Sequence, residues 1–233
     1  MTNGDGQKTT QTIPVLITPD GGSSSTLALK GGGNAMETDR DVGEGIVAWM
    51  SANTLADLGA LTARWLEGSL TAHSGYKGTL NAETANLLPV LARFNRAGLV
   101  TVNSQPGEDV DGCTQRAFVS GFCNEQVAQT VAAACMPTDL ICVCYWPEAV
   151  SFLNVPVSLD FGKAHTWAGM SMDVEDINHL WADLRSASAV DALVDACQVW
   201  VIDPRWGRNH LLWTTIDLAL AGPSLTGALP SDY

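Results

Sequence analysis

Polar and charged side chains gather in two short stretches beside two expected strands, NSQPGE at 103–108 and TQR at 114–116. Loops at strand ends often carry binding and catalytic groups, because a rigid scaffold holds them in place. The candidates for substrate binding here are Ser104, Gln105, Gln115 and Arg116, and the candidate base is Glu108. A guanidinium is a planar, two-pronged donor for carboxylate, sulfate or phosphate. The pattern also fits a stable turn in which Arg116 pairs with Glu108 or Asp109, so both interpretations stay open.

A third polar segment, DPRWGR at 203–208, follows an apolar strand. The carboxyl end of a strand is a frequent place for ligands in α/β proteins. Arg205 and Arg208 flank Trp206, and we expect these three side chains to bind an anionic group. In so acidic a protein, the two arginines fit a structural role equally well, in which they bind helix carbonyls or neighbouring carboxylates.

Asp57 lies three residues after Thr54, which is the expected N-cap of a helix. A carboxylate at this place accepts backbone N–H groups and lies at the positive end of the helix dipole. Helix capping is therefore the favoured interpretation. The functional alternative is that Asp57 points into a cleft, where it acts as a general base or binds a substrate ammonium.

Motifs for metals and nucleotides are absent from the sequence. The six cysteines, at 113, 123, 135, 142, 144 and 197, include no C-x-x-C pair, and the four histidines are scattered. No phosphate-binding G-x-x-x-x-G-K-[ST] loop, G-x-S-x-G elbow or H-E-x-x-H helix occurs. We predict no metal, no cofactor and buried free thiols, so that any enzymatic reaction would be cofactor-independent.

The charge and hydropathy of the chain limit its partners. The formal net charge is −13, so the field of the protein repels nucleic acid and anionic lipid. No window approaches the ~20 uninterrupted apolar residues that a membrane helix needs, and the N-terminus lacks a secretory signal pattern. We expect a cytoplasmic protein that binds a small molecule with amine and anionic groups. A protein partner or a homo-oligomer fits as well, whereas nucleic acid and membranes do not.

The periodicity of apolar residues predicts an alternation of helices and strands. The expected helices are 54–68, 81–96 with a kink at Pro89, 124–135, 173–185, a short one with a capping box at Ser188 and Asp191, and 210–220. The expected strands are 99–103, 116–122, 140–146, 155–159 and 198–202, and the apolar run at 140–146 is typical of a central strand.

This order of elements predicts one domain at 41–222 of the α/β or α+β class, in which a mixed sheet is covered by helices. Residues 1–40 are rich in Gly, Ser and Thr, which predicts a flexible segment. Residues 223–233 follow a Gly-Pro stop and are expected to form a mobile tail.

Four segments together resemble a family of uncharacterised domains common in actinobacteria: TLADLGALTARWLEGSL at 54–70, ETANLLPVLARFNRAGLVTVNSQPG at 83–107, TQRAFVSGF at 114–122 and VIDPRWGRNHLLW at 201–213. The resemblance implies a small cytoplasmic protein, in some members near biosynthetic genes, with no agreed activity. In that family the position before Gln115 is often acidic, whereas this chain has Thr114. The difference weakens the case for an acid–base role there.

The size of the chain and its lack of cofactor motifs are also similar to those of small ring-closing enzymes of aziridine amino-acid biosynthesis. In those enzymes an amine displaces a sulfate group, so the resemblance implies intramolecular amine cyclisation. In physical terms, Asp57 or Glu108 would take a proton from the substrate ammonium. Arg116, Arg205 or Arg208 would stabilise the departing anion.

The competing hypothesis is a noncatalytic binding or accessory subunit of a biosynthetic complex, in which exposed tryptophans and the acidic surface recognise a partner. The chain has 8 tryptophans, most of them on expected core faces. An enzyme needs a polar cleft, formed here by loops from separate stretches, whereas an accessory subunit needs a contiguous exposed apolar patch. Loops that meet in one polar cleft would therefore favour the enzyme, and loops that lie apart would favour the accessory subunit.

Overall fold

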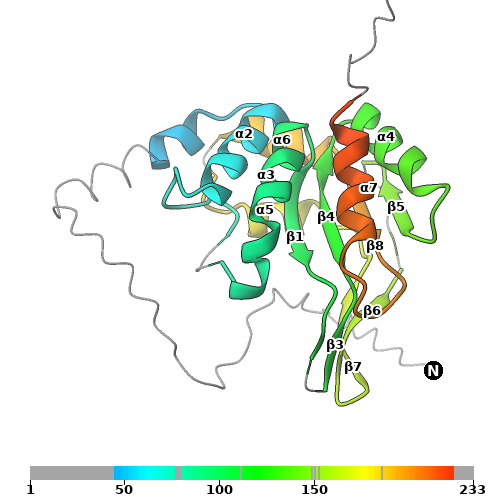
Figure 1. Ribbon diagram of the computed structural model, residues 1–233. Helices are drawn as coiled ribbons and strands as arrows, with labels where there is room; N and C mark the ends of the chain where they lie inside the picture. The colour runs from blue at the N-terminus through cyan, green and yellow to red at the C-terminus, as the bar shows by residue number, and fades with distance from the viewer. Residues whose placement is uncertain are drawn as a thin grey trace, which may run out of the picture. The chain divides into compact units, whose positions relative to one another are not determined.

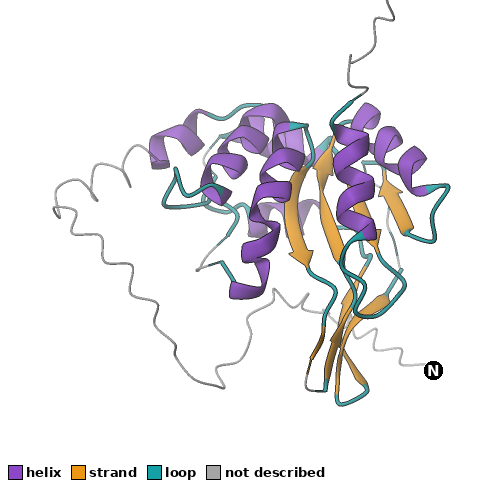
Figure 2. Cartoon of the chain, viewed as in Figure 1, coloured by secondary structure: helices purple, strands orange, loops and turns teal. Residues whose placement is uncertain are grey.

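The computed structural model describes residues 45–76, 80–110, 112–147, 149, 151, 153–184 and 186–222. The segment 1–40 predicted to be flexible and the predicted tail at 223–233 lie outside the described residues. The described elements form a single domain of mixed α/β structure, which confirms the expected fold class (Figures 1 and 2). Among the helices described, none has the length and apolar character that crossing a membrane requires.

The first sheet has the strand order β1-β4-β8-β5, and every neighbouring pair in it is antiparallel. Its strands are β1 (Val100–Gln105), β4 (Phe118–Cys123), β5 (Ile141–Tyr145) and β8 (Cys197–Ile202). Helix α4 (Glu125–Cys135) connects β4 to β5, which run parallel, and β8 then inserts between them. The expected mixed pairing is corrected for this reason, because β8 is antiparallel to both neighbours and leaves no parallel pair.

Strand β5 lies at an edge of this sheet and not at its centre, as the apolar run had predicted. The run is apolar because both faces of the strand are covered. Cys142 and Cys144 pack against the helical side, whereas Ile141 and Val143 pack on the opposite face. Coverage of both faces gives an edge strand the composition of a central one.

A second antiparallel sheet, the β-arm, has the order β2-β3-β6-β7. Its strands are β2 (Asp109–Val110), β3 (Cys113–Gln115), β6 (Val155–Asp160) and β7 (Lys163–Ala168), and Figure 1 shows β3, β6 and β7 extending away from the helices. The sequence predicts β6 alone. β2 and β3 are very short and β7 is mostly exposed, so none carries the apolar alternation on which strand prediction depends.

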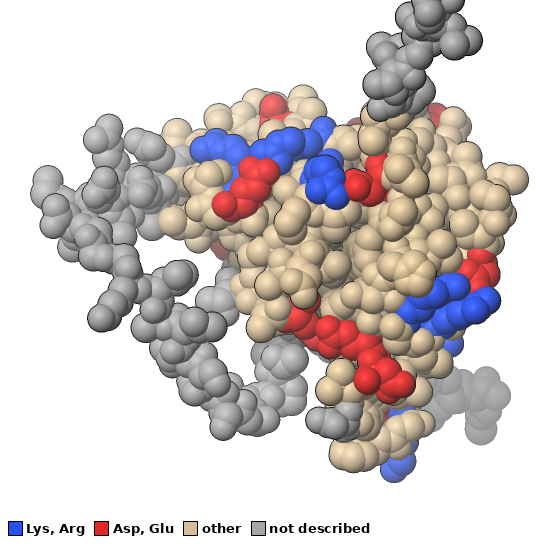
Figure 3. Space-filling view, viewed as in Figure 1, with Lys and Arg blue, Asp and Glu red and all other residues tan. Residues whose placement is uncertain are grey.

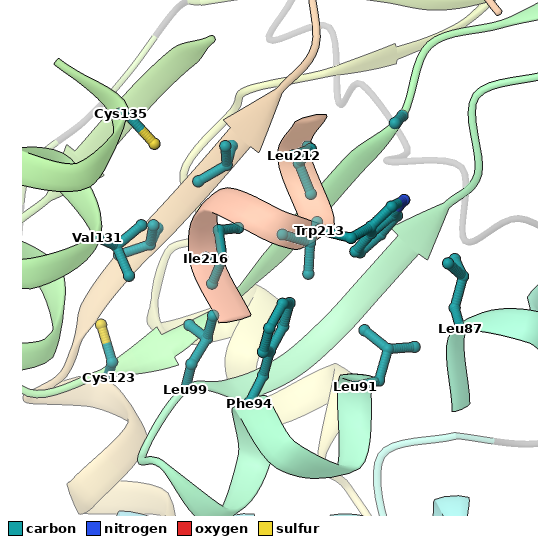
Figure 4. Packing of buried hydrophobic residues seen from close by; sticks show 14 of the residues in the cluster. Leu87, Leu91, Phe94, Leu99, Cys123, Val131, Cys135, Leu212, Trp213 and Ile216 are labelled. Carbon is teal, nitrogen blue, oxygen red and sulfur yellow. The ribbon is translucent and has the colours of Figure 1, made fainter. Parts of the chain in front are cut away.

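One face of the first sheet packs against α3 (Leu88–Arg96), α4 and α7 (Leu211–Leu220), with the buried residues drawn in Figure 4. Phe94 and Trp213 stack with ring centroids 6.4 Å apart. The other face packs against α2 (Leu55–Leu66), α5 (Val174–Leu180) and α6 (Ala187–Val194). Strand residues alternate between the two faces, as the pleat requires: Val119 and Phe122 of β4 belong to opposite clusters.

Three of the expected helix boundaries are corrected. The predicted kinked helix at 81–96 is a 3₁₀ helix (Ala82–Leu87) followed by α3, because Pro89 fits the first turn of a new helix, where no N–H partner is needed. Helix α5 ends at Leu180 and not near 185. Ser186 and not Ser188 caps α6, through a bond from Ala189 N to the Ser186 hydroxyl.

Gly121 permits the close approach of β1 and β4. A Cβ atom at this position would lie 2.3 Å from the carbonyl oxygen of Val100. We expect Gly121→Ala to lower the free energy of unfolding by about 3 kcal/mol in urea denaturation, because backbone atoms cannot yield as a side chain can. Gly45→Ala is the control, since its Cβ would meet only Leu70 at 3.9 Å. Equal losses in the two variants would contradict this explanation.

Candidate functional site

The three polar stretches meet where the β-arm joins the first sheet. Gly207 N donates to the Gln115 carbonyl oxygen at 2.9 Å, and Gly107 N donates to Asn209 Oδ1 at 2.9 Å. Gly107 lies so close to the second loop that a Cβ atom would be 2.2 Å from the Arg208 carbonyl oxygen. We call this region the loop junction and define it by residues 105–108, 115–116 and 203–209.

Gln105 links the two sheets at the loop junction. Its side chain is buried, and Nε2 donates to the carbonyl oxygens of Arg116 and Val157, each at 3.0 Å. Arg116 N also donates to the Val157 carbonyl oxygen, at 2.8 Å. These bonds give Gln105 a positioning role. The neighbouring Ser104 is half-buried in β1, where it pairs with Val119 of β4.

The Arg116 guanidinium stacks on the ring of Trp206, with Cζ 4.0 Å from the ring centroid. Nη1 donates to the Pro156 carbonyl oxygen at 2.7 Å, while Nε of Arg116 and Oε1 of Gln115 are buried without a partner among the described residues. No described carboxylate forms an ion pair with Arg116, so the expected pairing with Glu108 or Asp109 is not found. Burial lowers the pKa of Arg116, and the charge of Asp203 partly offsets this effect.

Arg205 and Arg208, by contrast, are held by carboxylates. Arg205 Nε donates to Asp139 Oδ2 at 2.9 Å, and Arg208 donates to Asp139 Oδ1 at 2.5 Å and to Asp203 Oδ2 at 2.6 Å. The hydrogen bond that Arg208 donates to Asp203 raises the pKa of Arg208 further, and the bond that Arg208 donates to Asp139 lowers the pKa of Asp139. On the face seen in Figure 3, basic side chains lie directly beside acidic ones. The structural interpretation of these two arginines therefore holds.

Glu108 lies on the same loop and is half-buried. Its backbone carbonyl accepts from Gln115 N at 2.6 Å, which anchors the loop beside Arg116. Its carboxylate forms no hydrogen bond or ion pair with the described residues. The loop junction thus contains one carboxylate, Glu108, and one guanidinium, Arg116, that have no ion-pair partner among the described residues.

Asp57 is a helix cap at a distance from the loop junction. Oδ2 accepts from Asn53 N and Thr54 N, each at 3.0 Å, and from the Thr54 hydroxyl at 2.9 Å. The bond from Asn53 N contributes most to lowering the pKa of Asp57. Figure 1 shows α2 beside the start of β1, whereas Gln105 ends that strand at the loop junction. The capping interpretation is confirmed, and Asp57 is not brought together with Arg116.

Three residues that organise the loop junction were not predicted as site residues from the sequence. Asn209 Oδ1 accepts from Gly107 N and from Trp213 Nε1, the latter at 3.0 Å. Asp203 is fully buried and Asp139 lies just before β5. Asn209 and Asp139 bind residues far away in the chain, so local spacing cannot identify them, whereas Asp203 binds Arg205 and Arg208 close by in the sequence. A strand-ending Asp-Pro at 203 was the one available hint.

The cysteines are all free thiols. Five lie in or against the core near α4, β5 and β8, where burial raises the pKa of Cys123, but Cys113 is exposed on the β-arm, which corrects the expectation of burial for that residue. In the part of the chain that the structure describes, no group of three or more Cys, His, Asp or Glu residues is arranged to hold a metal ion.

The role of Asp57 can be tested by its effect on stability. We expect Asp57→Ala to lower the free energy of unfolding by about 1 kcal/mol at neutral pH, because the capping box is lost. The folded-state pKa is lowered from 3.8, so the contribution of the charged form is present above this pH and disappears as the pH falls through the folded pKa. Thermal unfolding at pH 7 and near pH 2.5 should show the deficit shrinking; a constant deficit would contradict capping by the carboxylate.

The comparisons with known proteins give a family but no activity. A family model described as a domain of unknown function matches residues 45–223, which is more than half of the chain. The matched range includes the loop junction and α2. No curated protein matches the chain.

Proposed function

The chain belongs to the DUF6919 family, and we propose that it binds a small molecule carrying an amine and an anionic group at the loop junction. The observation that supports this proposal is the environment of the Arg116 guanidinium. In a protein of net charge −13, a guanidinium stacked on Trp206 without a described carboxylate partner is a local cationic point. Such a group attracts carboxylate, sulfate or phosphate.

The specific reaction that we propose is intramolecular amine cyclisation. Glu108 takes a proton from the substrate ammonium, and the freed nitrogen attacks the carbon that carries a sulfate group. A C–N bond forms as the C–O bond breaks, and sulfate leaves with the bonding electron pair toward Arg116. The atoms and charges balance without a cofactor, an oxidant or a reductant. The two unneutralised groups of the junction support these roles.

The proposal gives no catalytic or anion-binding role to three of the residues predicted from the sequence. Asp57 already accepts three hydrogen bonds at the start of α2. Arg205 and Arg208 are bound by Asp139 and Asp203, so an incoming anion would have to displace a carboxylate from either of them. We assign these arginines a positioning role, because they hold the loop that carries Trp206.

The proposal predicts sulfate release from 2-aminoethyl hydrogen sulfate, used as a minimal probe, at a rate above that of buffer. We expect Arg116→Ala and Glu108→Gln each to lower this rate by about 100-fold or more, because each removes a group that acts in the transition state. NMR of the probe and of the aziridine product measures both rates.

Arg96→Ala is the matched control, because Arg96 pairs with Glu67 on an exposed helical surface. We expect it to keep the wild-type rate. Far-UV circular dichroism checks that each variant is folded. Wild-type protein that binds the probe by calorimetry without turnover would leave the binding proposal standing and remove the cyclisation. Unchanged binding in Arg116→Ala would overturn both.

A second candidate function, noncatalytic association with a further copy through the β-arm, is supported by exposed apolar side chains. Val110, Phe161 and Trp167 are 56%, 82% and 48% exposed. Phe161 also has a φ of 44° in the two-residue turn that it forms with Gly162. Such a position favours Asn or Gly, and an exposed aromatic ring kept there at a cost in strain is typical of a binding surface.

Phe161→Asn separates strain from association. We expect the variant to match or exceed wild-type stability by up to about 1 kcal/mol, because Asn tolerates the left-handed region. If the β-arm mediates self-association, light scattering will show a dimer for wild-type protein and a monomer for the variant. A monomeric wild type at every salt concentration, including those that screen the net charge, would eliminate this second candidate.

A further inference from the structure

A histidine lies among three indole rings on the side of the domain formed by α2 and α5. The His73 ring centroid is 4.6 Å from that of Trp49, 4.7 Å from Trp65 and 5.3 Å from Trp181. These tryptophans, which we call the indole cluster, come from the helix at 45–51, from α2 and from the turn after α5. The four aromatic residues are far apart in sequence, so local spacing cannot reveal the arrangement.

Both ring nitrogens of His73 have a defined partner. Gly75 N donates to Nδ1 at 2.9 Å, and Nε2 lies 3.1 Å from the Thr62 hydroxyl oxygen. A backbone N–H can only donate, so Nδ1 must be the acceptor and Nε2 carries the proton. The arrangement therefore requires a neutral imidazole.

The segment 71–76 covers the indole cluster and depends on this imidazole. Trp49 Nε1 donates to the Ala72 carbonyl oxygen at 3.0 Å. Gly75 packs against Trp181 so closely that a Cβ atom would lie 3.0 Å from its ring. The Tyr76 ring lies 5.2 Å from that of Trp65. These contacts are all arranged around His73.

We propose that residues 71–76 form an acid-sensitive cover, which opens when His73 takes up a proton and exposes the indole cluster. An imidazolium presents N–H groups at both nitrogens, so Nδ1–H would face the Gly75 N–H and their hydrogen bond would be lost. The charge would also be left in an apolar environment, which disfavours it. Opening hydrates the ring and relieves both penalties.

The electrostatic surroundings of His73 also disfavour the protonated ring in the closed form. Burial lowers the pKa of His73 from 6.5 to about 3, and it is the sole cause of the shift. Tyr76 is the other titratable group of the cover, and its ring lies against Trp65; no described charged group on the helix at 45–51, α2 or α5 shifts the pKa of His73. The cation–π attraction of three indoles acts in the opposite direction, because it favours the imidazolium.

The sign of the pH dependence follows from the two pKa values. In the open form the ring titrates near 6.5, and in the closed form near 3. Above pH 6.5 both forms are neutral there, so pH has no effect through His73. Between these values each unit fall in pH raises the ratio of open to closed forms about tenfold.

Hydrogen exchange of the Gly75 amide, corrected for its intrinsic rate, tests the cover in the full chain. We expect wild-type protection to fall about tenfold per pH unit below pH 6.5, while far-UV circular dichroism stays constant. His73→Gln is the matched control, because its amide can accept from Gly75 and donate to Thr62 but does not titrate. Its protection should be independent of pH.

A second measurement on wild-type protein does not depend on the variant folding. The ¹⁵N chemical shifts of His73 should report a neutral Nε2–H tautomer in the closed form down to pH 4. A ring that titrates near 6.5 while Gly75 stays protected would overturn the proposal and show that the cation–π attraction prevails. The same pH dependence in His73→Gln as in wild type would overturn it as well.

Discussion

The arrangement of the molecule depends on the hydrogen bonds by which Gln105 joins its two sheets. One buried amide donates to a carbonyl of the strand-linking segment at Arg116 and to a carbonyl of β6 at Val157. A buried carbonyl without a partner is costly, so this side chain provides a donor for the Arg116 carbonyl and a second donor for the Val157 carbonyl, which also accepts from Arg116 N. Because the bonds fix where the β-arm leaves the first sheet, they also fix where Arg116 meets Trp206.

The chain is strongly acidic, and the arginines around the loop junction differ in whether a carboxylate pairs with them. Asp139 and Asp203 bind Arg205 and Arg208, which closes the loop but leaves no cation free. Arg116 is shielded from direct pairing by its stacking on Trp206 and its bond to a backbone carbonyl. Among the described arginines of the loop junction, Arg116 is therefore the one without a carboxylate partner, a local difference that net charge alone would not reveal.

Local signals in the sequence predicted the elements with strong caps and apolar periodicity. Thr54 with Asp57 and Asn124 both begin helices as expected, and β8 follows its apolar run. Of the β-arm, the sequence predicted β6 alone, because β2 and β3 are very short and β7 is mostly exposed, so none of these three has an apolar face. For the candidate site, the sequence indicated the three polar stretches that meet, but not Asn209 or Asp139, which bind residues far along the chain. Local spacing carries no information on such contacts.

Two residues lie in environments that their residue types rarely adopt, and the contacts that stabilise them there differ. Phe161 adopts a left-handed conformation at the end of the β-arm with its ring mostly in solvent, so its surroundings give little that offsets the strain. His73 is also unusual, but three indoles and two hydrogen bonds account for its place as a neutral ring. The first residue therefore points outward, from the exposed end of the β-arm where we propose self-association. The second points inward, to a packing arrangement that holds only while one nitrogen stays unprotonated.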